Sequence, residues 1–227
     1  MSPRAVDLPY HPTVMPKTPS PDPLPAAPTA PRGGPRWQAT HARIIEAAEE
    51  LFTELGYGPV TVEEVVRDAE TTRATFYKHF SGKGAVVEEL ILIERAKLEP
   101  LWQPLHDLPP KPSLELLQQW ARGAADKWIR HAGRMRIFEE AAHADPRVAL
   151  RAQYIAEDTG ARIQRALAHL AWQDEGHARV ECLLIAAQMR QVFSYWTSTP
   201  PPERDPRILD AFADNWHRAL GRGGAAE

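Results

Sequence analysis

Apolar residues recur at spacings of three and four along most of the chain after residue 36, which is the pattern of amphipathic helices. The clearest helical face ends at Gly56 and consists of Ile44, Ile45, Ala48, Leu51, Phe52 and Leu55. The same pattern predicts helices over about 62–69, 72–80, 83–98, 113–131, 134–143, 147–171, 177–197 and 207–220. No convincing alternation of apolar and polar residues occurs, so we predict an all-α protein.

Local signals place several of the helix starts. Thr61 is followed three residues later by Glu64, which is the spacing of a capping box, and Thr72 is the next N-cap candidate. Asp145-Pro146 and Asp205-Pro206 each place an N-cap side chain before a proline at the first helical position. Pro100, Pro104 and the prolines over 109–112 predict a loop between helices.

Proline usage divides the chain. Of the 22 prolines, 11 fall within residues 1–36, where large apolar side chains are few. Because proline removes backbone donors, we expect 1–36 to be a disordered tail. We assign residues 37–84 to a first helical domain and 85–227 to a second, larger one.

Charge and cysteine content exclude several classes of protein. The net charge is −3, which excludes a protein covered with basic charge for non-specific nucleic-acid binding. A local basic patch is still possible. Cys182 is the single cysteine, so no internal disulfide or multi-cysteine metal site can form. No apolar run approaches the roughly 20 residues of a membrane-spanning helix, and residues 1–12 lack the apolar region of a secretory signal. We therefore expect a soluble cytoplasmic protein with no membrane partner.

The helices expected within residues 40–84 resemble a helix-turn-helix unit, with a tight turn at Glu70-Thr71. On the third helix, Phe76 and Phe80 share an inward face, while Ala74, Thr75 and Lys78 point outward. Residues 71–83 contain three formal positive charges and no acidic residue, whereas 37–70 contain two arginines and eight acidic residues. A basic strip on an acidic domain is what a helix among DNA phosphates requires, although such a strip is also common on a merely solvated face.

Residues 43–91 resemble the DNA-binding domain of TetR-family transcriptional regulators. The shared elements are the Arg-Ile-x-x-Ala-Ala-x-x-Leu-Phe helix, Gly56-Tyr57, the Thr61-Val62 helix start, and residues 75–80 (TFYKHF) with Lys83. The resemblance implies base contacts from Arg73, Ala74, Thr75 and Lys78, and phosphate contacts from Tyr77, His79 and Lys83. Thr61, Thr72 and Thr40 are expected to add contacts at helix starts. The proline-rich tail, with net charge +2, is then either plain disordered chain or an arm that adds weak contact to DNA.

Four positions depart from the family pattern. Glu70 stands where the turn usually has glycine, and Val66 where a small alanine separates the two helices. Because glutamate reaches positive φ only at a steric cost, we expect a strained or altered turn. Gly82 and Gly84 replace the usual serine and glutamate, which weakens the cap of the fourth helix.

For residues 85–227 the resemblance implies a ligand-binding and dimerisation domain. The helices 177–197 and 207–220 are amphipathic and suit a symmetric four-helix interface between two subunits, or else close the core of one subunit. A short stretch over 188–193 is similar to the EthR-like branch of the family. It points to an apolar pocket lined by Trp120, Phe138, Gln188, Met189 and Phe193, with Gln188 as the polar anchor, although aromatic residues at helical spacing are more often core.

The sequence thus predicts a homodimeric, ligand-responsive regulator that binds a palindromic double-stranded DNA operator, most simply a repressor released by a small apolar or aromatic effector. The alternative is a helical small-molecule or metal-binding protein of the same fold that has lost DNA binding, for which Glu70, Val66 and Gly84 are the motivation. Glu139 and His143 could form a two-ligand metal edge. Because no catalytic, phosphate-binding or complete metal motif occurs, we expect no enzyme activity, cofactor or metal site.

Overall fold

The computed structural model describes residues 33–170, 172 and 174–222, and this part of the chain is all-α, as predicted. The N-terminal helices are α1 (Pro35–Leu55), α2 (Val62–Asp68) and α3 (Arg73–His79), followed by the long α4 (Lys83–Leu98). The predicted tail falls outside the described residues for positions 1–32. Its last residues differ from the prediction, because α1 begins at Pro35, where a proline at the first turn is favourable.

The larger part of the protein begins with two short elements, η1 (Glu99–Leu101) and α5 (Gln103–His106), in a segment predicted to be irregular. The helices that follow are α6 (Leu114–Ile129), α7 (Ala132–Ala144), α8 (Pro146–Ala166), α9 (Glu175–Ser198) and α10 (Arg207–Arg222), with η2 (Pro201–Glu203) at the triple proline. The predicted helix over 147–171 ends earlier, at Ala166.

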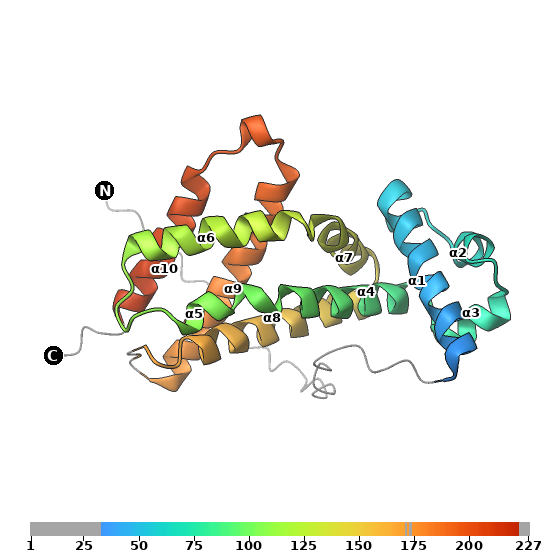
Figure 1. The fold of residues 1–227 in the computed structure, drawn as a ribbon, viewed down its shortest axis with the longest axis horizontal. Coiled ribbons are helices and arrows are strands. Elements are labelled where there is room, and N and C mark those ends of the chain that lie inside the picture. Colours follow the sequence, from blue (N-terminus) through green and yellow to red (C-terminus); the bar gives the residue numbers. More distant parts are fainter. Residues whose placement is uncertain (1–32, 171, 173, 223–227) are drawn as a thin grey trace, which may run out of the picture.

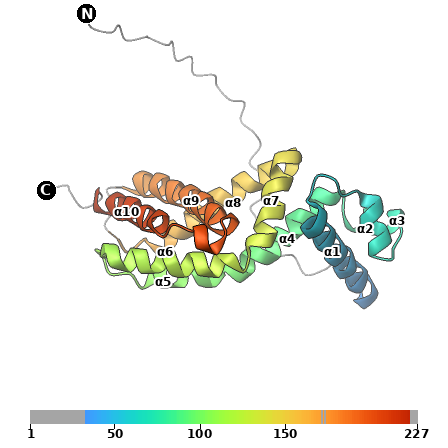
Figure 2. The same ribbon diagram turned by 90° about the horizontal axis from the view of Figure 1, so that it is seen from above.

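The molecule is elongated. Figure 1 shows α1, α2 and α3 together at one end, with α4 running from them into the larger helical part. There α8 packs along α9, and α6 packs along α10. Figure 2 shows α7 crossing between the bundle and α1, and α7 contacts α1, α4 and α8. One helix therefore touches both the N-terminal unit and the body of the larger part.

Caps and turns follow the predicted signals. Thr61 and Glu64 form the complete capping box, and the Thr72 side chain accepts a hydrogen bond from the Thr75 backbone N–H. Glu70 is the one non-glycine residue with positive φ, at 46°, within the described residues. The turn therefore keeps the left-handed conformation despite losing glycine, and glutamate bears the strain.

Buried side chains form two clusters. One lies in the bundle and includes Trp120, Trp128, Phe193, Phe212 and Trp216. The other contains the cores of α1, α2 and α3 together with residues of α4, α7 and the start of α8, such as Val86, Phe138 and Val148. The apolar core is continuous across the predicted boundary at residues 84/85.

Gly84 explains how α4 approaches the start of α8. A Cβ atom built on Gly84 would lie 2.3 Å from Asp145 Oδ2 and 3.3 Å from Val148 Cγ2. The glycine that looked like a weakened helix cap is therefore a point of close packing. Gly82 is the N-cap residue and makes no side-chain cap, as expected.

Candidate nucleic-acid interface and internal cavity

The outward face of α3 carries the side chains predicted to read DNA. Arg73, Ala74, Tyr77 and Lys78 are exposed, and Thr75 is half-buried. Phe76 is fully buried, so it anchors α3 on the N-terminal core and fixes which side of the helix faces out. In a helix-turn-helix unit this exposed side is the one that enters the major groove.

Arg73 makes two local contacts. Its guanidinium forms an ion pair with Glu63 of α2, and its Cζ lies 5.6 Å from the centre of the Tyr77 ring. Both partners of the ion pair are exposed, and such pairs contribute only about 0–1 kcal/mol. Arg73 can therefore exchange Glu63 for a base or a phosphate at little cost.

The three threonines predicted near DNA differ in position. Thr61 and Thr72 lie at helix starts, where their hydroxyls cap Glu64 and Thr75. Thr40 does not lie at a helix start, because α1 begins at Pro35. Its hydroxyl donates to the Arg36 carbonyl at 3.1 Å, and the expectation of a helix-start contact from Thr40 is wrong.

Lys83 is not available in the way the resemblance implied. Its ammonium donates to the carbonyl oxygens of Tyr57, Gly58 and Val60 at 2.7, 3.0 and 2.8 Å, which uses all three N–H groups. It also lies 4.2 Å from the centre of the Tyr57 ring. Burial lowers the pKa of Lys83 below its ordinary value. Lys83 therefore holds the α1–α2 turn against α4 and is not a free phosphate ligand.

His79 lies at the end of α3 in a cluster that the sequence did not reveal. Its Nδ1 is 3.3 Å from Nδ1 of His41, and Nε2 of the buried His41 is 2.7 Å from Glu89 Oε1. The Trp37 ring stacks on His41 and lies 4.3 Å, centre to centre, from the His79 ring. Burial, followed by the proximity of His41, lowers the pKa of His79.

Two acidic residues, one on α1 and one on α4, link these helices to α7. Arg134 of α7 donates to Glu49 of α1 at 2.8 Å and to Glu94 of α4 at 2.6 Å. Glu94 is 2 % exposed and also pairs with His131. Burial raises its pKa, but the hydrogen bonds and charges of His131, Arg134 and Lys97 outweigh this, and the net pKa is below the ordinary value.

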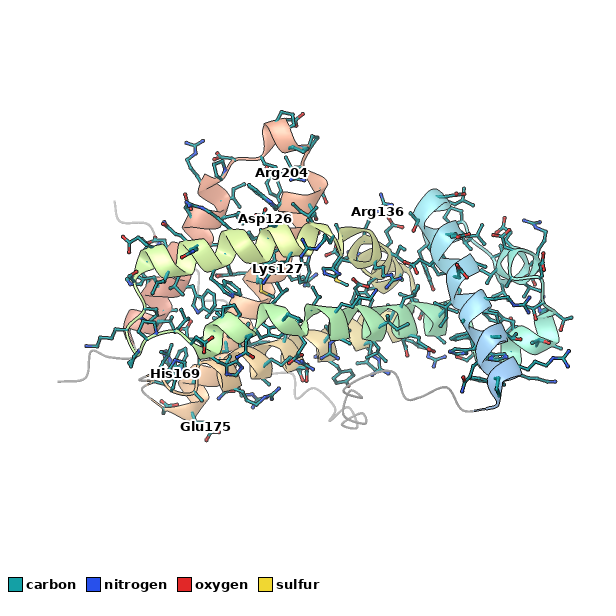
Figure 3. The ribbon with its side chains drawn as sticks, in the orientation of Figure 1. Asp126, Lys127, Arg136, His169, Glu175 and Arg204 are labelled. Carbon is teal, nitrogen blue, oxygen red and sulfur yellow. The ribbon has the colours of Figure 1, made fainter. Side chains whose placement is uncertain are left out.

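A second set of contacts joins the α1–α2 turn to the α7–α8 junction. Glu140 accepts the Tyr57 backbone N–H at 3.0 Å, and Asp145 accepts the Tyr57 hydroxyl at 3.3 Å. Burial and the nearby Asp145 carboxylate raise the pKa of Tyr57 to about 12, so the hydroxyl keeps its proton. Arg136, which Figure 3 shows on α7 toward α1, donates to the Thr53 carbonyl at 3.3 Å.

An internal cavity of about 120 Å³ lies between α4, α6, α7, α8 and α9. Its wall is mainly apolar, with Trp102, Trp128, Met135, Phe138, Ile155 and Met189 among its members. The indole N–H of Trp128 is buried and has no hydrogen-bond partner within the described part of the chain. An unpartnered donor in an apolar wall favours an occupant with a hydrogen-bond acceptor.

The predicted pocket residues divide into two groups. Phe138 and Met189 line the cavity. Phe193 lies behind the wall, with its ring 5.6 Å from that of Trp128, and Trp120 packs on Trp216 and borders a separate surface groove. Gln188 is exposed, because α9 turns it away from the bundle, so it does not serve as a polar anchor in this cavity. The polar lining comes instead from Arg95, Glu139, His143, Thr159, Arg162 and Arg190.

Glu139 and His143, the two possible metal ligands, have other hydrogen-bond partners. His143 Nδ1 lies 2.7 Å from the Glu139 carbonyl, and the Glu139 carboxylate accepts the Ser194 hydroxyl at 2.9 Å. Across residues 33–170, 172 and 174–222, no three His, Cys, Asp or Glu side chains are placed to hold a metal ion. None of the helices in these ranges is long and apolar enough to cross a bilayer.

Helix α9 leaves an apolar face uncovered. Val180, Leu183 and Leu184 are 56, 38 and 51 % exposed, and Ala187 lies exposed one turn further on. On α10, by contrast, Leu209, Phe212 and Trp216 are buried against the bundle. Of the two helices predicted for a subunit interface, α9 presents the apolar surface, and the large apolar side chains of α10 complete the core of the subunit.

Comparison with known proteins agrees with this arrangement. Residues 44–90 match the model of the family described as bacterial regulatory proteins, tetR family. YdeS of Bacillus subtilis, named as a transcriptional regulator of helix-turn-helix type, is 41% identical over 61 residues, which cover 27% of this chain and 31% of YdeS. The chain thus covers about a third of the length of YdeS and of two further curated relatives.

Solved structures share the fold over most of the chain. GusR of Salmonella enterica superposes with a TM-score of 0.60 at 18% identity, covering 85% of this chain and 100% of GusR. FadR of Thermus thermophilus, described as a TetR-family repressor in complex with lauroyl-CoA, gives 0.54 at 23% identity and covers 82% of this chain and 96% of FadR. Residues 44–90 are therefore similar to the tetR family of bacterial regulatory proteins and to the matching third of curated relatives such as YdeS, and the chain shares the all-helical fold of these solved structures.

Proposed function

We propose that the protein is a dimeric, sequence-specific DNA-binding regulator, a repressor that leaves a palindromic operator when a small apolar or aromatic effector fills the internal cavity. The observation that carries the proposal is α7, which lines the cavity with Met135 and Phe138 and bonds to α1 through Arg134. A molecule in the cavity would therefore contact α7, which is bonded to one of the helices that position α3. An effector releases DNA only if it binds the non-binding arrangement more tightly.

The first test is selection of binding sequences from a random duplex pool by the purified protein. The proposal expects an enriched palindrome whose half-sites are spaced by about 34–36 Å, one turn of DNA. A folded protein that enriches no sequence at low salt would contradict the proposal and favour the ligand-binding alternative.

Lys78 is the exposed lysine of α3, and we expect it to contact DNA. Replacing Lys78 with alanine is expected to weaken binding to the selected duplex. If Lys78 meets a phosphate, the slope of log affinity against log salt becomes shallower by about one unit for each subunit. Fluorescence anisotropy from 50 to 300 mM salt gives both values. Lys111→Ala, at an exposed loop position, is the control and should match the unmodified protein; an unchanged slope in Lys78→Ala would exclude this role.

The exposed face of α9 supports dimerisation through Val180, Leu183 and Leu184. Leu184→Glu would place a charge in an apolar interface but at an exposed site of the single subunit, so we expect a folded monomer. Sedimentation equilibrium measures the state of association. Leu150→Glu, at a leucine of α8 that is 43 % exposed, should remain dimeric. A Leu184→Glu protein that sediments as a dimer would place the interface elsewhere.

The effector proposal rests on the cavity and the free Trp128 N–H. Its volume of about 120 Å³ is close to the roughly 150 Å³ engineered cavity that holds benzene, so a single-ring compound with one hydrogen-bond acceptor fits without rearrangement. A set of such compounds can be screened for a rise in melting temperature and for release of the selected duplex. Compounds that stabilise the protein but leave DNA bound would argue against the coupling through α7.

A further inference from the structure

We propose that His79 donates from Nε2 to a DNA phosphate and that His41 and Glu89 position it, so that DNA binding takes up one proton for each subunit. The inference rests on the proposed function, because it assigns a proton to the DNA-bound state. It starts from the chain of contacts between Glu89 Oε1, His41 Nε2, His41 Nδ1 and His79 Nδ1.

Hydrogen-bond donors and acceptors restrict the protons in this chain. A carboxylate only accepts, so His41 Nε2 carries a proton toward Glu89, at 2.7 Å. The 3.3 Å contact between the two Nδ1 atoms needs one proton between them. With these two protons the pair of rings is neutral, and His79 Nε2 presents a lone pair. Among the described residues, no group lies within hydrogen-bonding distance of this nitrogen.

A phosphate oxygen also only accepts, so it can bond to His79 Nε2 only when a third proton is present. Two imidazole rings with three protons carry one positive charge, whichever ring holds the Nδ1 proton. A fourth proton would break the contact between the two Nδ1 atoms. The DNA-bound state is thus expected to contain the singly charged pair, whose charge faces both Glu89 and the phosphate.

The groups around His41 and His79 explain why the third proton is taken up when DNA binds. The two histidines are surrounded by Trp37 from α1, Phe80 after α3 and Glu89 from α4. Glu89 is the carboxylate that faces the histidine pair, through His41. Before DNA arrives, burial and His41 lower the pKa of His79, which favours the neutral form of its ring. The phosphate then stabilises the cation, and the stacked Trp37 ring adds a cation–π contact. Since the complex holds more protons than the free protein, affinity rises as pH falls.

The test uses the full-length protein and a labelled 30-base-pair duplex of mixed sequence at low salt, because phosphate contacts do not depend on sequence. Anisotropy titrations at pH 6.5, 7.0, 7.5 and 8.0 give Kd as a function of pH. We expect Kd to increase by about tenfold per pH unit for each contacting subunit. Calorimetric titration in buffers of different ionisation enthalpy should show uptake of one proton per subunit.

Two variants separate this role from a structural one. His79→Gln keeps an N–H donor but cannot titrate, so its Kd should change by less than about twofold over the same range. Glu89→Gln removes the charge that stabilises the cation, so the rise in Kd should begin at a lower pH. His106→Gln, at an exposed site of α5, should behave like the unmodified protein.

The outcomes are distinct. Binding with the same Kd from pH 6.5 to 8.0, or His79→Gln with the pH dependence of the unmodified protein, would overturn the proton uptake while leaving DNA binding intact. Failure to bind any duplex at every pH would overturn the proposed function and this inference with it. Circular dichroism of each variant at each pH confirms that folded protein is compared.

Discussion

Replacing Arg134 with methionine is expected to lower the free energy of unfolding at pH 7 by about 3 kcal/mol. Arg134 bridges Glu49 of α1 and Glu94 of α4, and Glu94 is 2 % exposed. Methionine retains much of the apolar volume but leaves the buried carboxylate with His131 and Lys97 as its remaining partners. The cost arises because a buried charge has lost part of its compensation.

The pH dependence of the lost stability shows whether the Glu94 charge is its cause. In the unmodified protein the pKa of Glu94 is lowered, so its stabilising contribution is present above its ordinary pKa and is lost as pH falls below it. Without Arg134 the pKa of Glu94 rises, so the carboxyl can become neutral at a higher pH. The difference in unfolding free energy should therefore be largest at pH 7 and shrink toward pH 5.

Urea unfolding at pH 5, 6 and 7 measures this difference, with Arg130→Met as the matched control. Arg130 is exposed at the end of α6, and its replacement should change stability by less than about 0.5 kcal/mol. An Arg134→Met penalty that does not vary with pH would show that lost packing, and not the Glu94 charge, is responsible.

Replacing Ala74 with glutamate should abolish most DNA binding without affecting the fold. Ala74 is exposed on α3 between Arg73 and Lys78, and glutamate is a good helix former. A carboxylate on the face that enters the groove opposes the phosphates and bases, and like-charge contacts at an interface cost several kcal/mol. We expect the affinity for the selected duplex to fall by about a hundredfold or more.

Ala168→Glu is the control for this variant, because Ala168 is exposed in the turn after α8, next to the labelled His169 at the end of the molecule far from α3 (Figure 3). It adds the same charge but should bind DNA almost as tightly as the unmodified protein. The melting temperatures of both variants should stay close to that of the unmodified protein. If Ala74→Glu binds the duplex normally, then the exposed face of α3 does not meet DNA.

Periodicity and capping signals predicted the helices well because these signals are local. Thr61 with Glu64 and Asp145 with Pro146 mark helix starts that the structure places at the same residues. The strain at Glu70 was also predictable, because the φ > 0 requirement belongs to the turn itself. The short α5 was not predicted because Pro104 lies within it and further prolines lie on both sides of it.

Side chains whose role depends on distant partners could not be predicted in the same way. Lys83 matches the family motif, yet its ammonium is held by three carbonyls of the α1–α2 turn. His41 is 38 residues from His79 and 48 residues from Glu89 in the sequence, and nothing in this spacing indicates a contact. Gln188 has the right residue type for a polar anchor, but the orientation of α9 turns it outward. These outcomes depend on packing between helices.

The core that continues from the N-terminal helices into α7 and α8 limits how this chain can be divided. Phe138 and Val148 belong to the same buried cluster as Phe52 and Phe76. A fragment ending at residue 84 would expose to water the apolar surface that these residues cover. A chimera that joins the N-terminal helices to the larger domain of another protein must therefore also carry over the matching faces of α7 and α8.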